Sequence, residues 1–242
     1  MDPWHYDPAS DLEQSLAARL KQFPREPDML VYGLRGLAAV AVRGWLRVYH
    51  RFCVRGRQWL PANGSYILVA NHSSHLDAVC LLAALPFAKL HRAFPAAARD
   101  YFFVTTHRAF AAAVLVNALP FEREASPRQS LAICRRLLDN PGNVLVLFPE
   151  GTRSPNGRMG EFKAGIGMLV CASDVPVLPC YISGASAALP KGTWLPRPRK
   201  VTVTIGQPLT FAHRPRGKES ALQIAEELRT AVLALASQES LS

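Results

Sequence analysis

Residues 65–70 read SYILVA, and the polar stretch NHSSHLD at residues 71–77 follows them directly. A continuous apolar run of this length is typical of a strand that is buried on both faces, as in a parallel sheet. Residues 144–148 (VLVLF) form a second such run, and the polar residues 149–154 (PEGTRS) follow it. We therefore expect both polar stretches at the carboxyl edge of one sheet, where open α/β folds bind ligands.

Further strands and helices are predicted to alternate along the rest of the chain. Apolar patterns predict strands at residues 119–123, 176–182 and 200–205. Periodicity and capping residues predict helices at residues 75–85, 126–139, 162–172 and 220–237. In the last strand Val and Ile alternate with Thr, so we expect it to have one exposed face or to lie at an edge. This order predicts an α/β domain with a mainly parallel central sheet flanked by helices.

The composition is that of a basic globular protein. The chain has 242 residues, with 28 Lys+Arg against 18 Asp+Glu and a net charge of +10. An apolar fraction of 49% with 19% charged residues excludes a largely disordered chain. The excess of basic residues predicts an anionic partner, which can be nucleic acid, an anionic membrane or a phosphorylated substrate. The five cysteines form no CxxC pair, so a reduced, cytosolic setting is expected.

The first 57 residues differ from the remainder, residues 58–242, which we expect to form the globular domain. Residues 1–28 are predicted to be a polar arm without a signal peptide. Residues 29–57 contain six arginines and no acidic residue. On a helix, four of these arginines fall within one face: Arg35, Arg43, Arg47 and Arg51. This pattern predicts a basic amphipathic segment at a membrane interface, or alternatively a helix packed on the domain with solvated arginines. No stretch of roughly 20 apolar residues predicts a membrane-spanning helix.

The first polar stretch contains groups suited to acid–base chemistry. His72 and Asp77 are five residues apart, which on a regular helix separates them by about 140°, so their side chains would not meet. They can meet if His72 lies in the loop before the helix and Asp77 in its first turn. The carboxylate would then orient the imidazole as a general base. The alternative is a structural role, in which Ser73 and Ser74 cap the helix.

The second polar stretch has the composition of a phosphate-binding turn. Gly151 stands beside Thr152 and Arg153, just after a predicted strand. Such a turn can present backbone N–H groups and a guanidinium to a phosphate. Taken alone this pattern is unspecific, because many turns contain Gly, Thr and Arg.

The two stretches together, about 70 residues apart, resemble the motifs of the glycerolipid acyltransferase family, typified by 1-acylglycerol-3-phosphate acyltransferases. That family carries Asn-His-x-Ser-x-x-Asp, matched at residues 71–77, and Phe-Pro-Glu-Gly-Thr-Arg-Ser, matched at residues 148–154. Other family blocks resemble residues 121–123, 162–165 and 175–179. The resemblance covers roughly residues 60–210 and implies an acyltransferase domain in residues 58–242.

The resemblance implies a role for each matched residue. His72 would deprotonate the acceptor hydroxyl while Asp77 orients it, and the hydroxyl would attack the thioester of acyl-CoA or an acyl-carrier protein directly. The acceptor pocket would comprise Glu150, Gly151, Thr152 and Arg153. Arg123 and Lys163 would add positive charge for a phosphate. The alternatives are a surface charge for Arg123, beside two glutamates, and a snorkelling helix residue for Lys163.

The predicted function is that of a peripheral O-acyltransferase at the cytoplasmic face of a membrane, acting on a lysophospholipid. The first choice of acceptor is 1-acylglycerol-3-phosphate, which would give phosphatidic acid. The resemblance implies no metal ion, no bound cofactor and no nucleic-acid partner. The block before Arg123 lacks the family's Gly and Ile/Val run, which leaves other acceptors open, such as a lyso-aminolipid. His75 is not part of the family motif and is expected to point away from Asp77.

Other function classes explain less of the sequence. A metal hydrolase using His72, His75 and Asp77 would leave the Glu-Gly-Thr-Arg stretch unexplained. A serine hydrolase is disfavoured because no GxSxG occurs, and no P-loop or dinucleotide fingerprint is present. A non-catalytic lipid-binding protein remains an alternative, and mutation of His72 and Asp77 would distinguish it, because binding would survive and catalysis would not.

Overall fold

A computed structural model describes residues 29–98, 119–121, 127–154 and 157–240. The predicted arm at residues 1–28 and the predicted site residue Arg123 lie outside the described residues.

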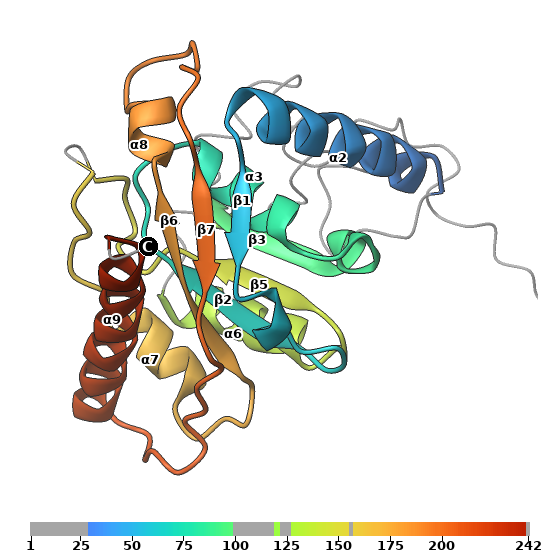
Figure 1. Cartoon of the computed structure of the whole chain (residues 1–242). Coiled ribbons are helices and arrows are strands. Elements are labelled where there is room, and N and C mark those ends of the chain that lie inside the picture. The colour runs from blue at the N-terminus through green and yellow to red at the C-terminus, as the bar shows by residue number, and fades with distance from the viewer. Residues whose placement is uncertain (1–28, 99–118, 122–126, 155–156, 241–242) are drawn as a thin grey trace, which may run out of the picture.

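The domain is built on one seven-stranded sheet (Figure 1). Its strands are β1 (Cys53–Arg55), β2 (Tyr66–Ala70), β3 (Ala93–Ala98), β4 (Leu119–Phe121), β5 (Val144–Leu147), β6 (Val177–Ser183) and β7 (Thr202–Ile205). Their order across the sheet is β1-β7-β6-β2-β5-β3-β4. The β6–β7 pair is antiparallel and every other neighbouring pair is parallel. This confirms the predicted α/β fold with a mainly parallel sheet.

Helices cover both faces of the sheet. The described helices are α2 (Met29–Tyr49), α3 (Leu76–Ala84), α6 (Pro127–Leu138), α7 (Gly165–Val170), α8 (Ala185–Ala188) and α9 (Lys218–Ser240), with short 3-10 turns η1 (Arg57–Trp59) and η2 (Phe87–Arg92). One apolar cluster joins the sheet to α2 and α3, and a second joins it to α6, α7 and α9. No helix among the described residues is long and apolar enough to cross a membrane.

The position of β2 in the middle of the sheet, with helices on both faces, explains why its sequence is apolar throughout. Successive side chains of a strand point to opposite faces of the sheet. Tyr66, Leu68 and Ala70 accordingly belong to the cluster under α3, whereas Ile67 and Val69 belong to the cluster under α9. All five are fully buried, as the continuous apolar run predicts.

The prediction for the last strand is wrong in one respect. We expected residues 200–205 to have an exposed face or to lie at an edge, but every residue of β7 is buried. The reason is that β1 pairs with β7 on its outer side, and helix α3 contacts it. The three residues of β1 lie within residues 29–57, the predicted basic membrane segment.

Helix α7 is shorter than predicted. The expected helix begins at residue 162, whereas α7 begins at Gly165. The backbone N–H of Lys163 donates to the carbonyl of Pro149, which ties this residue to the loop after β5 instead of to a helical turn. Phe162 and Lys163 therefore lie in a connection beside that loop.

Helix α2 turns part of its basic face toward the domain. Arg35 is only 4% exposed, and the guanidinium of Arg43 donates to the carbonyl of Leu85 and lies 3.8 Å from the centre of the Phe87 ring. Large apolar side chains point outward instead, with Leu37 71%, Val40 60% and Val48 81% exposed. Helix α2 forms most of the predicted helical face but ends at Tyr49, before Arg51. The alternative of solvated arginines is corrected, because two of the four arginines pack against the domain. The other two, Arg47 and Arg51, are exposed.

Candidate active site

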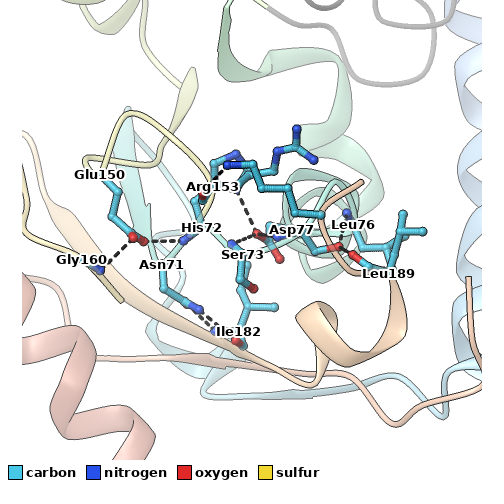
Figure 2. Close-up of polar contacts among 12 residues, drawn as sticks. Asn71, His72, Ser73, Leu76, Asp77, Glu150, Arg153, Gly160, Ile182 and Leu189 are labelled. Atoms are coloured by element: carbon cyan, nitrogen blue, oxygen red, sulfur yellow. Dashed lines mark hydrogen bonds and ion pairs between the residues drawn. The ribbon is translucent and has the colours of Figure 1, made fainter. Parts of the chain in front are cut away.

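Asn71 sets the direction in which the chain leaves the central strand. Its side-chain amide donates to the carbonyl of Ile182 at 3.0 Å and accepts the Ile182 N–H at 2.8 Å (Figure 2). These two bonds continue the β2–β6 ladder by means of a side chain, one residue beyond the last strand residue of β2. Asn71 is 4% exposed, so the amide is protected from competing water. His72 is thereby placed at the carboxyl end of the sheet.

His72 and Asp77 form the hydrogen-bonded pair that the sequence suggests. Nδ1 of His72 lies 2.9 Å from Oδ2 of Asp77, with His72 in the loop and Asp77 in the first turn of α3. The carboxylate is fully buried, and the same oxygen accepts the backbone N–H groups of Ser73 and Ser74 at 2.6 and 2.7 Å. Two backbone donors at a helix N-terminus stabilise the carboxylate anion. It can therefore orient the imidazole and stabilise its protonated form.

The second imidazole nitrogen of His72, Nε2, is the one that can act as a base. The His72 side chain is 22% exposed, and its ring stacks on Phe148 with ring centroids 4.2 Å apart. Since Nδ1 is engaged by Asp77, Nε2 is the nitrogen that a substrate can reach. The alternative role of Ser73 and Ser74 as helix caps is corrected: the residue at the cap position is His75, and its side chain makes no capping hydrogen bond. The Ser74 hydroxyl instead accepts the Leu76 N–H and donates to the Leu189 carbonyl. Within this motif, Asp77 orients His72 and the Ser74 hydroxyl connects the start of α3 to Leu189.

The second polar stretch holds the backbone of His72 from both sides. The Glu150 carboxylate accepts the His72 N–H at 2.7 Å (Figure 2). The Ser154 N–H donates to the His72 carbonyl at 2.8 Å. The other oxygen of Glu150 accepts the Gly160 N–H at 2.8 Å. Glu150 is only 9% exposed, and backbone donors occupy both of its oxygens. The two motifs therefore form a single site, as their order in the chain predicts.

Cationic groups gather beside this stretch. Gly151 has φ +74°, and a Cβ there would lie 2.5 Å from Nζ of Lys163, so the lysine ammonium lies against the glycine. Arg153 is half-buried, and its carbonyl accepts a hydrogen bond from Nζ of Lys191 at 3.2 Å. Gly151 and Thr152 are exposed. The turn thus presents open backbone next to positive charge, which suits a phosphate.

Sequence reasoning missed Lys191 as a neighbour of this turn. Lys191 lies 38 residues after Arg153 in the sequence and belongs to neither of the two polar stretches. Strand β6 and helix α8, which precede Lys191, place it next to Arg153. No sequence motif around Lys191 predicts this contact.

His75 lies within electrostatic range of the site. The pKa of this histidine is lowered to about 4, mainly by burial and in addition by the charges of Arg153 and His72. His75 is therefore neutral at pH 7.

Among the described residues, no three His, Cys, Asp or Glu side chains form a group that could hold a metal ion.

Comparisons with known proteins agree with this geometry. The chain is 28% identical over 148 residues to the chloroplastic 1-acyl-sn-glycerol-3-phosphate acyltransferase BAT2 of Brassica napus, covering 60% of this chain and 41% of the relative. It is 32% identical over 133 residues to the human 1-acyl-sn-glycerol-3-phosphate acyltransferase alpha, covering 54% and 44%. The chain thus spans less than half the length of these curated relatives.

A solved structure and a family model extend the comparison. The crystal structure of the 1-acyl-sn-glycerophosphate acyltransferase PlsC from Thermotoga maritima is 25% identical, with a TM-score of 0.60 over 85% of this chain and 80% of that chain. Residues 51–183 match the model of the Acyltransferase family. That range is more than half of the chain and includes both polar stretches and the strands before them. The chain therefore belongs to the Acyltransferase family.

Proposed function

We propose that this protein is an O-acyltransferase that moves a fatty acyl group from a thioester to the hydroxyl of 1-acyl-sn-glycerol-3-phosphate, giving phosphatidic acid. The observation that carries the proposal is the 2.9 Å contact between His72 and the buried Asp77, next to a cationic turn. The donor is acyl-CoA or an acyl-carrier protein. The names of the relatives support the choice of acceptor.

The reaction needs only a base, an oriented hydroxyl and a thioester. Nδ1 of His72 keeps its proton toward Asp77, so Nε2 accepts the proton of the acceptor hydroxyl. The hydroxyl oxygen attacks the thioester carbonyl carbon, and the tetrahedral intermediate releases the thiolate. The thiolate takes the proton from Nε2, and an ester has replaced the thioester without an acyl-enzyme. Asp77 stabilises the transient imidazolium.

The cationic turn holds the phosphate of the acceptor. Arg153 offers a fork of N–H donors, and Lys163 offers a point charge beside the exposed backbone of Gly151 and Thr152. Arg123 remains in this proposal on the family resemblance alone. Glu150, whose oxygens are engaged by backbone donors, supports the site instead of contacting the acceptor.

The protein works at an anionic membrane surface, at its cytoplasmic face. The outward apolar side chains of α2 adjoin the loop after α8, because the Tyr49 hydroxyl donates to the Pro196 carbonyl at 2.9 Å. That loop exposes Trp194 (87%) and Leu195 (62%). The same two segments also carry exposed cations: Arg47, Arg51, Arg197, Arg199 and Lys200. Exposed aromatic and aliphatic groups among cations match a lipid interface.

The experiment that tests the proposed function is product analysis with a panel of substrates. A long-chain acyl-CoA and an acyl-carrier protein are each offered with 1-acylglycerol-3-phosphate, glycerol-3-phosphate and a lyso-aminolipid without a phosphate. We expect phosphatidic acid from the first acceptor, and Lys163→Gln to raise its KM about tenfold. Transfer to the lyso-aminolipid alone would contradict the proposal that 1-acylglycerol-3-phosphate is the acceptor. No acceptor-dependent product would instead favour a lipid-binding protein.

A further inference from the structure

A chain of hydrogen bonds connects the C-terminal helix α9 to the backbone of His72. Nε of Arg229 donates to the carbonyl of Gly160 at 3.1 Å. The Gly160 N–H donates to one oxygen of Glu150 at 2.8 Å, and the other oxygen accepts the His72 N–H at 2.7 Å (Figure 2). The guanidinium of Arg229 is itself held by Glu226 at 2.9 Å, one turn earlier on the helix. Four residues from three separate parts of the sequence thus form one connection.

The segment around Gly160 is confined between α9 and Glu150. A Cβ at Gly160 would lie 3.2 Å from Oε2 of Glu150, so the peptide approaches the carboxylate closely. Two residues later, Phe162 is 7% exposed and belongs to the apolar cluster that contains Ile224 and Leu228 of α9. The helix therefore holds this segment by an apolar anchor and by the Arg229 hydrogen bond. The second contact is the one that aligns the Gly160 peptide.

We propose that Arg229 is a positioning residue, which holds Gly160 so that the Glu150 carboxylate stays aimed at the His72 amide. A nearly buried carboxylate needs both of its backbone donors, because a carboxylate oxygen without a partner is costly. If Gly160 shifts, Glu150 loses one of its two backbone donors, and the carboxylate no longer holds the His72 N–H in place. The kinetic consequence rests on the proposed function, whereas the structural coupling does not.

The kinetic test compares Arg229 with a matched arginine. Arg214 forms a similar 2.9 Å ion pair with α9, through Glu227, and its side chain is 34% exposed against 27% for Arg229. We expect Arg229→Met to lower kcat about threefold to tenfold with the acceptor KM changed by less than about twofold. Arg229→Lys restores most of kcat, and Arg214→Met keeps the wild-type value. Equal kcat in the two Met variants would overturn the proposal, as would an effect of Arg229→Met on KM alone.

The coupling is tested separately by hydrogen exchange on the full chain. In Arg229→Met, amide exchange should become faster in peptides that cover His72 and Gly160, whose N–H groups both bind Glu150. Arg214→Met should leave these peptides unchanged. This result stands even if the wild type transfers no acyl group, so failure of the proposed function is distinguishable. Unchanged exchange at His72 and Gly160 in Arg229→Met would overturn the inference.

Discussion

The imidazole of His72 is fixed through its ring and through its own peptide groups. Asp77 binds Nδ1, Phe148 supports the ring face, and Glu150 and Ser154 hold the N–H and the carbonyl. Preorganisation of this kind lowers the entropic cost of placing a base against a hydroxyl. The base therefore depends on residues that never contact substrate.

Glu150 gives the sharpest prediction at this scale. In Glu150→Gln an amide NH₂ replaces one of two acceptor oxygens, so one backbone N–H faces another donor. We expect kcat to fall about tenfold or more for every acceptor, with little change in KM. Steady-state kinetics with two acceptors that differ in their head group provide the measurement. A rise in KM for phosphate-bearing acceptors, with kcat preserved, would instead place Glu150 in the acceptor pocket.

His75 makes the folded state sensitive to acid. Its pKa is lowered to about 4, mainly by burial and further by Arg153 and His72, from an ordinary value of 6.5. As pH falls from about 6.5 to about 4, the unfolded chain binds a proton that the folded chain does not, so the free energy of unfolding falls in that window and is unaffected above it. Between pH 7 and pH 5 the loss is about 1 kcal/mol, because solvent screening weakens the effect for a half-buried side chain.

Urea unfolding of the wild type and of His75→Gln at pH 7 and pH 5 measures how much His75 contributes to this loss of stability. The variant should lose less stability between pH 7 and pH 5 than the wild type. An identical loss in both proteins would show that His75 is not the group responsible.

At the scale of elements, the contact between α7 and α9 positions the helix that carries Arg229. A Cβ at Gly167 would lie 2.0 Å from the carbonyl oxygen of Ala221, so the helices approach at a glycine. Gly167→Ala should lower the free energy of unfolding by about 2–3 kcal/mol. Gly165→Ala in the same helix is the control, because nothing lies within 4 Å of its Cβ position. Denaturant unfolding that gives equal stability for both variants would contradict this close approach.

The elements differ in how far the sequence could predict them. Strands β2 and β5 were predictable because burial on both faces leaves an unbroken apolar run. The surroundings of β7 were not, because its covering strand β1 has only three residues, CVR, with no strand pattern of its own. The orientation of α2 could not be predicted from its sequence either, because an arginine can donate to the carbonyls at a helix end as readily as it faces water.

The candidate site shows the same division. The motifs at residues 71–77 and 148–154 predicted the pairing of His72 with Asp77 and their place beside a cationic turn. The double use of Glu150 by backbone donors and the approach of Lys191 were not predictable, because both depend on contacts between distant segments.

At the scale of the whole molecule, the candidate site and the exposed apolar surface lie close together. Figure 1 shows α2 and the β6–β7 connection with α8 at the same end of the molecule. Nδ1 of His50, just after α2, lies 3.1 Å from the Arg199 carbonyl, and Lys191 of the same connection binds Arg153. A lipid acceptor in the membrane would therefore lie near the cationic turn.

The membrane hypothesis predicts the behaviour of surface variants. Leu37→Ser combined with Val48→Ser should weaken sedimentation with anionic phosphatidylglycerol vesicles about tenfold, because two exposed apolar groups are lost. Substitutions are preferable to removal of residues 1–57, which would delete β1 from the sheet. Leu222→Ser on α9, 50% exposed, is the matched control. Equal sedimentation of the double variant and the control would contradict a membrane role for α2.

The most direct test of the central claim is acceptor-dependent thiol release from a long-chain acyl thioester, with wild type and His72→Ala compared in lipid vesicles. Removal of the base should reduce the rate by about 10²-fold or more while the variant keeps the wild-type unfolding midpoint. Release that requires the acceptor and is lost in His72→Ala is the result expected of a His72–Asp77 acyltransferase. Release that persists at the wild-type rate in His72→Ala would contradict it.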